Sequence, residues 1–139
     1  VIAWACLLVA LLVTQSATAK RIKSEDEHNR AWCAEMGGRA EVINNDKTRV
    51  DCLTLGYAIE ADFADKWYEA IGQAVHYSRM QGRFPGVLLI VERPEHCAKV
   101  RAALLAIWHI RVKTELGGMM PIRFWVVGDK ICHTKKVDA

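Results

Sequence analysis

The sequence lacks the histidine and cysteine spacings that usually mark a metal site. Its histidines are scattered, with no HxH or HExxH arrangement, and no two cysteines stand at the short spacing of a zinc knuckle. A zinc centre is therefore not expected. The chain also contains no internal repeat and no low-complexity segment, so a repeat architecture is not expected either.

Charge is absent from residues 1–19, and Lys20 follows at once. Residues 1–13 are almost wholly apolar, a short polar stretch comes next, and Ala17-Thr18-Ala19 supplies a small-x-small step. This order predicts a signal peptide that is cut after Ala19. An uncleaved membrane anchor is the alternative, although the apolar run falls short of the roughly 20 residues that span a bilayer. We therefore expect a secreted or periplasmic protein.

A strong excess of one charge is also missing. The chain has 139 residues and a formal net charge of +3. Its length predicts one domain over residues 20–139. The mild positive charge is only weak support for a polyanionic partner, because a protein that coats DNA is usually far more basic.

Hydrophobic periodicity and turn residues predict an α/β chain. The predicted helices cover residues 26–36, 63–80 and 95–110, and the predicted strands cover residues 39–43, 48–53, 57–62, 86–91 and 121–127. The order α-β-β-β-α-β-α-β, with a hairpin first and crossover helices later, predicts one mixed sheet with helices on both faces. Residues 20–28 and 129–139 are expected to be loose tails.

Four cysteines follow the predicted signal peptide: Cys33, Cys52, Cys97 and Cys132. In an oxidising compartment they can form disulfides, and three pairings are open. Cys33 lies on the predicted helix before the hairpin, and Cys52 points away from Asp51 on its strand, so we expect a Cys33–Cys52 link. Cys97, among apolar neighbours on the last predicted helix, is expected to be a free buried thiol.

Three carboxylates lie on two consecutive predicted strands, where acidic residues are normally depleted. Glu60 and Asp62 share one face of their strand, and Asp51 can join them if the strands pair accordingly. Three such anions would repel one another, and a divalent cation removes the conflict. The alternative is that this face of the sheet is simply solvated.

The following helix carries polar residues on the side that leads back to these carboxylates. Lys66, Gln73 and Tyr77 are spaced by seven and four residues, which places them along one helix face. Each has an ordinary alternative: an exposed lysine paired with Asp62, a polar surface residue and an aromatic residue at the edge of the core.

Together these residues resemble the PD-(D/E)XK nuclease superfamily. That family has a helix with a Glu, a hairpin, an Asp at a strand end, Glu-x-Lys on the next strand and, in one branch, Gln-x-x-x-Tyr on the next helix. The matching residues here are Glu35, Asp51, Glu60, Gln73 and Tyr77. The resemblance implies a restriction-endonuclease-like fold and metal-dependent hydrolysis of phosphodiesters.

The resemblance spans residues 31–127 and has one important departure. Asp62 stands where the family has its lysine, and Lys66 is the residue that could take over that role from the helix. Val50 also replaces the proline that often precedes the motif Asp.

The resemblance also implies a role for each residue. Asp51, Glu60 and Asp62 would hold Mg²⁺, with Mn²⁺ as a substitute, and Lys66 would orient the attacking water. Gln73 would position the nucleophile or the lysine, and Glu35 would add to the outer shell or a second metal. The implied partner is nucleic acid, DNA in preference to RNA.

Two other functions remain open at this point. A domain of the same fold without cleavage activity would act as a nucleic-acid or protein binding module outside the cytoplasm. A structural exported protein, in which the carboxylates splay into water, is the third interpretation.

Overall fold

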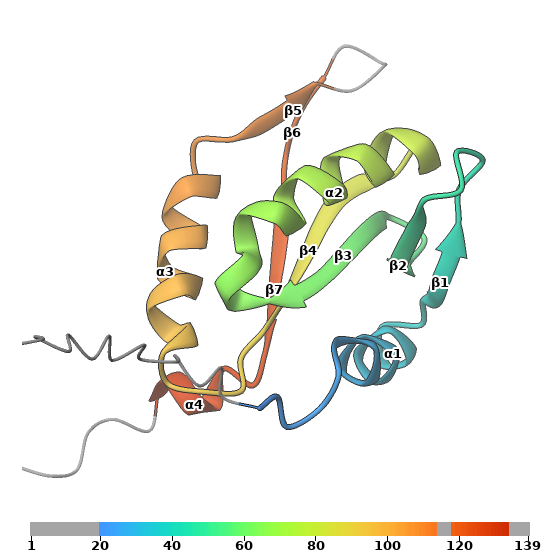
Figure 1. Cartoon of the computed structure of the whole chain (residues 1–139). Coiled ribbons are helices and arrows are strands. Elements are labelled where there is room, and N and C mark those ends of the chain that lie inside the picture. The colour runs from blue at the N-terminus through green and yellow to red at the C-terminus, as the bar shows by residue number, and fades with distance from the viewer. Residues whose placement is uncertain (1–19, 114–117, 134–139) are drawn as a thin grey trace, which may run out of the picture.

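The computed structural model describes residues 20–113 and 118–133 (Figure 1). A five-stranded sheet with the order β1-β2-β3-β4-β7 forms its centre, and β5 pairs with β6 in a small separate sheet. The elements are α1 (Glu25–Glu35), β1 (Arg39–Ile43), β2 (Arg49–Leu53), β3 (Tyr57–Phe63), η1 (Ala64–Lys66), α2 (Trp67–Gln81), β4 (Phe84–Ile90), α3 (His96–Ile107), β5 (Arg111–Lys113), β6 (Met119–Pro121), β7 (Arg123–Val127) and α4 (Lys130–His133).

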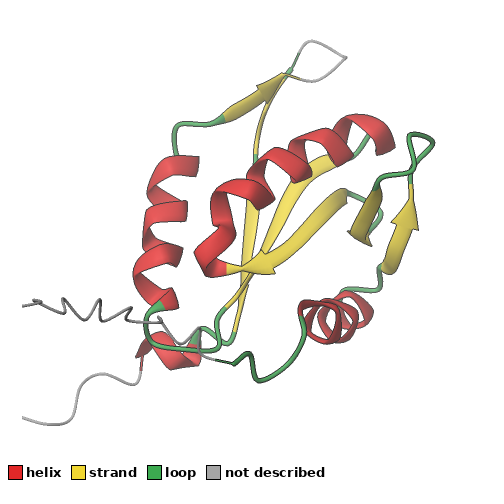
Figure 2. Cartoon of the chain, viewed as in Figure 1, coloured by secondary structure: helices red, strands yellow, loops and turns green. Residues whose placement is uncertain are grey.

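The central sheet is mixed, as the sequence predicts. The pairs β1–β2 and β2–β3 are antiparallel, whereas β3–β4 and β4–β7 are parallel. A hairpin turn suffices between antiparallel neighbours, but parallel neighbours need a crossover. The helix α2 makes the first crossover, and the segment with α3, β5 and β6 makes the second (Figures 1 and 2).

Helices cover both faces of the sheet because the apolar residues of its inner strand β4 alternate between the two faces. In β4, Val87 and Leu89 pack in the cluster that includes α2 and α3. Leu88 points the other way and packs in the cluster that contains Cys33 of α1. The strand is therefore buried on both sides, as its continuous apolar run predicts.

The helix α1 begins earlier than predicted. Ser24 caps it: its hydroxyl accepts the N–H of Glu27, and the Glu27 carboxylate accepts the N–H of Ser24, which together form a capping box. The two residues before the cap are fixed as well, because the N–H groups of Ile22 and Lys23 donate to the buried carboxylate of Glu92. The loose tail expected at residues 20–28 is therefore an anchored segment.

The structure modifies the predicted central helix mainly at its start. A 3-10 turn, Ala64–Lys66, comes between β3 and α2, so Lys66 stands immediately before the α-helix. The helix ends at Gly82, whose φ of 59° lies in the left-handed region that glycine adopts without strain.

The C-terminal third holds two corrections. The helix α4 occupies part of the predicted tail at residues 129–139, and Cys132 on α4 forms a disulfide with Cys97 on α3. The prediction that Cys97 is a free thiol is therefore wrong, because α4 brings Cys132 to a Cα–Cα distance of 5.5 Å. The predicted Cys33–Cys52 disulfide is confirmed, with a Cα–Cα distance of 5.6 Å.

The predicted signal peptide, residues 1–19, lies outside the described residues and stays a prediction. Within the part of the chain that the structure describes, no helix combines the length and the apolar character needed to cross a membrane.

Candidate metal centre between β2 and β3

The candidate site lies where β2 and β3 stop pairing. Their register consists of Cys52↔Ile59 and Leu53↔Ala58, while β3 continues to Phe63. Beyond this point, hydrogen bonds made by side chains take the place of the backbone hydrogen bonds between the two strands. The Asp51 carboxylate accepts the N–H of Ala61 at 2.9 Å, and the side chain of Asn29 donates to the Asp51 carbonyl at 2.8 Å.

Four carboxyl groups lie near one another in this gap, as two neighbouring pairs. Asp51 pairs with Glu60, and Glu25, from the first turn of α1, pairs with Asp62. Asp51, Glu60 and Asp62 are all buried. Two acidic groups packed together away from water favour a proton on one of them, and the pKa values of all four groups are raised accordingly.

The electrostatics of the cluster follow from burial and from like charges. Burial, with the charge of Asp51 as the next cause, raises the pKa of Glu60 to about 10. Burial and the neighbouring Glu25 raise the pKa of Asp62 to about 7. The pKa values of Asp51 and Glu25 are also raised, mainly by burial. These raised pKa values favour the neutral, protonated form of the carboxyl groups unless a positive charge lies close to them.

One oxygen in the cluster has no partner. Glu60 is only 7 % exposed, and its Oε2 atom is buried without a hydrogen bond. A buried oxygen without a partner normally costs stability. Among the residues that the structure describes, however, no three His, Cys, Asp or Glu side chains are already arranged to hold a metal ion. A cation would therefore have to rearrange these side chains as it binds.

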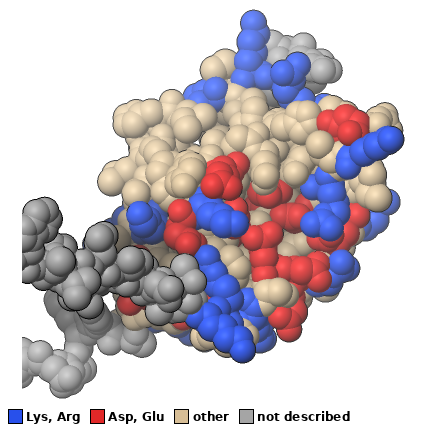
Figure 3. Space-filling view, viewed as in Figure 1, with Lys and Arg blue, Asp and Glu red and all other residues tan. Residues whose placement is uncertain are grey.

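The cluster opens into a hollow of about 550 Å³. Asp51 and Glu60 form its floor, and Gln73 and Tyr77 line it from α2. Burial, followed by the charge of Glu60, raises the pKa of the Tyr77 hydroxyl to about 12, so this hydroxyl stays protonated and can donate a hydrogen bond. Figure 3 shows acidic side chains across the middle of this face, with basic side chains on either side.

The β1–β2 turn forms the opposite wall, with Lys47, Thr48 and Arg49 among the lining residues. The turn is attached to α2, because His76 Nε2 lies 2.6 Å from Asp46 Oδ2. Gln81 also donates to the side chain of Asn44. The hairpin and the helix are thereby held on either side of the carboxyl groups.

Lys66 lies beside the Glu25–Asp62 pair. Its Nζ atom is 3.9 Å from Asp62 Oδ1, and its side chain is 50 % exposed. Its charge lowers the pKa values of Asp62 and Glu25, whereas Arg49 is the cation that acts on Asp51. The lysine is therefore next to the cluster, on the side of Asp62.

The structure brings together most of the predicted site residues. Asp51, Glu60, Asp62, Lys66 and Gln73 all lie in or beside the hollow.

Glu35 is the exception. It is exposed at the end of α1, about ten residues or roughly 15 Å of helix away from Glu25. Glu25 is the helix carboxylate that reaches the cluster, and sequence reasoning placed it in a tail. The capping box from Ser24 to Glu27 was the signal that could have located the helix start.

Comparison of the chain with protein-family models, curated proteins and solved structures found no match.

Proposed function

We propose that the protein is a metal-dependent nuclease whose domain has the restriction-endonuclease-like fold of the PD-(D/E)XK superfamily. Asp51, Glu60 and Asp62 hold Mg²⁺ or Mn²⁺, and nucleic acid, DNA before RNA, is the substrate. The observation that carries this proposal is the buried Glu60 carboxyl, whose free oxygen lies among three other carboxyl groups at the floor of an open hollow.

The donor set fits a hard cation. It consists of carboxylate oxygens alone, which Mg²⁺ and Mn²⁺ prefer. The order of antiparallel β1-β2-β3 followed by parallel β3-β4-β7 supports the same proposal. When bound, the cation would lower the pKa of a water molecule and offset the charge of the phosphate.

The residues around the hollow have distinct roles in this proposal. Lys66, half exposed beside Asp62, binds a non-bridging phosphate oxygen and helps to orient the attacking water. Lys47 and Arg49 on the hairpin wall attract the flanking phosphates. Gln73 and Tyr77 donate hydrogen bonds from α2 and hold the substrate against the carboxyl groups.

We also propose that the protein is exported. Two disulfides among the described residues are consistent with an oxidising compartment. The predicted signal peptide at residues 1–19 supports the same location. The substrate would then be foreign or released nucleic acid.

A second candidate function is a binding module on the same fold without cleavage. It is favoured by the position of Lys66, which contacts the Glu25–Asp62 pair and not the Asp51–Glu60 pair. Such a module would bind nucleic acid or protein through the cations around the hollow.

A cleavage assay separates the two functions. Purified protein is incubated with end-labelled single-stranded and double-stranded DNA in Mg²⁺, in Mn²⁺ and in EDTA. The nuclease proposal predicts cleavage with either metal, none in EDTA and none with Asp51→Ala. Metal-independent DNA binding without cleavage by the native protein would support the binding module instead.

Lys66→Ala tests the assignment of the lysine. The variant should lose cleavage while its fold and its Mg²⁺ affinity stay nearly unchanged, because Lys66 donates no atom to the metal. Lys99→Ala, an exposed lysine on α3, is the matched control. If native protein and Lys66→Ala cleave DNA equally well, Lys66 is not the catalytic lysine.

A further inference from the structure

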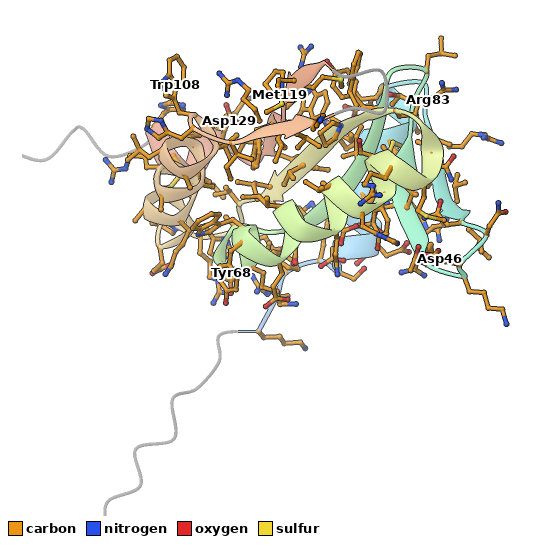
Figure 4. All side chains as sticks on the ribbon, turned by 90° about the horizontal axis from the view of Figure 1, so that it is seen from above. Asp46, Tyr68, Arg83, Trp108, Met119 and Asp129 are labelled. Atoms are coloured by element: carbon orange, nitrogen blue, oxygen red, sulfur yellow. A yellow bond between two sulfur atoms is a disulfide. The ribbon has the colours of Figure 1, made fainter. Side chains whose placement is uncertain are left out.

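A second and larger hollow, of about 810 Å³, lies on the other side of α2. Val75 and Arg79 line it from the helix, whereas Gln73 and Tyr77 face the carboxyl groups. Residues spaced by four share a helix face, so the two hollows are on different sides of one helix. In Figure 4, Arg83 and Met119 lie above α2 and Asp46 lies below it.

The charged side chains that line this second hollow, among the described residues, are all basic. Arg79, Arg83 and Lys113 line it, and among the residues that the structure describes no Asp or Glu does. Within the part of the chain that the structure describes, the side chains of these three cations make no hydrogen bond or ion pair. Three cations around one concavity, with no counter-charge from the described residues, favour an anionic ligand.

The rest of the lining is hydrocarbon. The residues that supply it are Leu55, Val75, Phe84, Pro85, Val112 and Met120. Phe84 is 46 % exposed, and its ring therefore offers apolar surface to a ligand. Among the described lining residues Ser78 is the one with a neutral polar side chain, and its hydroxyl already donates to the Arg83 carbonyl at 2.6 Å.

The combination of three cations with an apolar lining favours one kind of anion over another. A nucleotide would bring a base and a sugar whose polar groups need hydrogen-bond partners, and the described part of the lining leaves no neutral side chain free to supply them. A hydrocarbon body needs none, and burying it against aliphatic walls is favourable. The volume also lies in the range of small-molecule sites, roughly 300–1,000 Å³.

We propose that this hollow is a binding site for a small organic anion with a hydrocarbon body, of the class of medium-chain fatty acids. The head group binds to Arg79, Arg83 and Lys113, and the chain lies against Phe84, Val112 and Met120. The proposal does not depend on the nuclease function.

The test uses decanoate as the probe in isothermal titration calorimetry. Native protein should bind about one decanoate per chain and should not bind acetate at the same concentration, because acetate lacks the hydrocarbon. The double variant Arg79→Gln/Arg83→Gln should weaken decanoate binding at least about tenfold. Val112→Asp, which adds an anion and removes apolar surface, should weaken it as well.

The matched control is Lys99→Gln/Arg101→Gln, which removes two exposed cations from α3. Its affinity for decanoate should equal that of native protein. All variants share residues 1–19, so binding to that apolar run cancels in the comparison. Circular dichroism checks that each variant is folded.

Three results would overturn the proposal. Native protein could fail to bind decanoate, or the double variant could bind it as tightly as the control does. Acetate or inorganic phosphate could bind as tightly as decanoate, which would assign the hollow to simple anions. Displacement of decanoate by a short oligothymidylate would assign it to nucleic acid.

Discussion

At the scale of single residues, Glu60 and Asp62 make the stability of the protein depend on pH. Their ordinary pKa values are 4.5 and 3.8, and in the folded protein they rise to about 10 and about 7, chiefly because the groups are buried. The folded state therefore holds protons that the unfolded state has released. This contribution to stability is complete below the ordinary values and is lost as pH rises through them towards the folded values.

The first prediction follows from this sign. In EDTA, the free energy of unfolding should fall between pH 5 and pH 8, with a slope of about 1.4 kcal/mol per pH unit for each retained proton. Urea denaturation at a series of pH values measures the slope. Glu60→Gln, which cannot ionise, should show a shallower slope, and an equal slope in both proteins would contradict the assignment.

Gly38 shows how tightly the first disulfide is packed. A Cβ atom at this position would lie 2.6 Å from Cys52 Sγ and 2.8 Å from Cys33 Sγ. We predict that Gly38→Ala lowers the free energy of unfolding by about 1–3 kcal/mol, because the disulfide must shift. Thermal unfolding measures the change.

Gly72 supplies the control for that substitution. It lies inside α2, and a Cβ atom there would meet nothing within 4 Å. Gly72→Ala should be neutral or stabilise the protein by up to about 1 kcal/mol, since alanine is the better helix former. If both variants were destabilised equally, the close packing at Gly38 would not be the reason.

At the scale of elements, the position of α1 decides whether Glu25 reaches the cluster. Glu92 fixes the approach to the helix: it accepts the N–H groups of Ile22 and Lys23, and its Oε1 atom lies 2.9 Å from His28 Nε2. These hydrogen bonds with the backbone and His28 lower the pKa of Glu92 to about 2. The Cys33–Cys52 disulfide holds the same helix near its other end.

The third prediction tests this anchor. Glu92→Gln should lower the free energy of unfolding by about 2–3 kcal/mol, because hydrogen bonds to a charged group are lost. Because the folded pKa is depressed, the difference from native protein should be present above pH 4.5 and should shrink as pH falls towards 2. Urea denaturation at pH 7 and pH 3 measures it, and equal effects at both would contradict the charged role.

The elements also show what local pattern can predict. The helix α2 and the strand β4 follow directly from periodicity and from a continuous apolar run. The separation of β2 from β3 after Cys52 does not, because it depends on Asp51 and Asn29 replacing the ladder. The alternation of side chains along the strands predicts that Asp51 and Glu60 lie close together. It does not predict that Glu25 joins them, because that depends on where α1 packs.

At the scale of the whole molecule, two disulfides tie peripheral helices to the layers around the sheet. Cys33–Cys52 joins α1 to β2, and Cys97–Cys132 joins α3 to α4. The sequence does not predict the second pairing, because the segment after Gly128 has no strong periodicity and only the even number of cysteines indicates it. The contact between α3 and the short helix α4 depends on tertiary packing, which local sequence patterns do not predict.

The fourth prediction concerns this second disulfide. It closes a sequence separation of 35 residues, so Cys97→Ala/Cys132→Ala should lower the free energy of unfolding by about 4 kcal/mol on loop-closure grounds. The carboxyl cluster lies on other elements, so metal-dependent activity per folded molecule should persist. Urea denaturation and the cleavage assay measure the two effects, and loss of activity in the folded variant would contradict their independence.

The central claim is that Glu60 belongs to a cation site, and direct binding of Mn²⁺ tests it without relying on catalysis. The electron paramagnetic resonance signal of free Mn²⁺ is recorded as protein is added at pH 8. Native protein and Glu35→Gln should remove Mn²⁺ from solution, since Glu35 lies at the far end of α1, whereas Glu60→Gln should not. Binding that is absent from the native protein, or that is unchanged in Glu60→Gln, would contradict it.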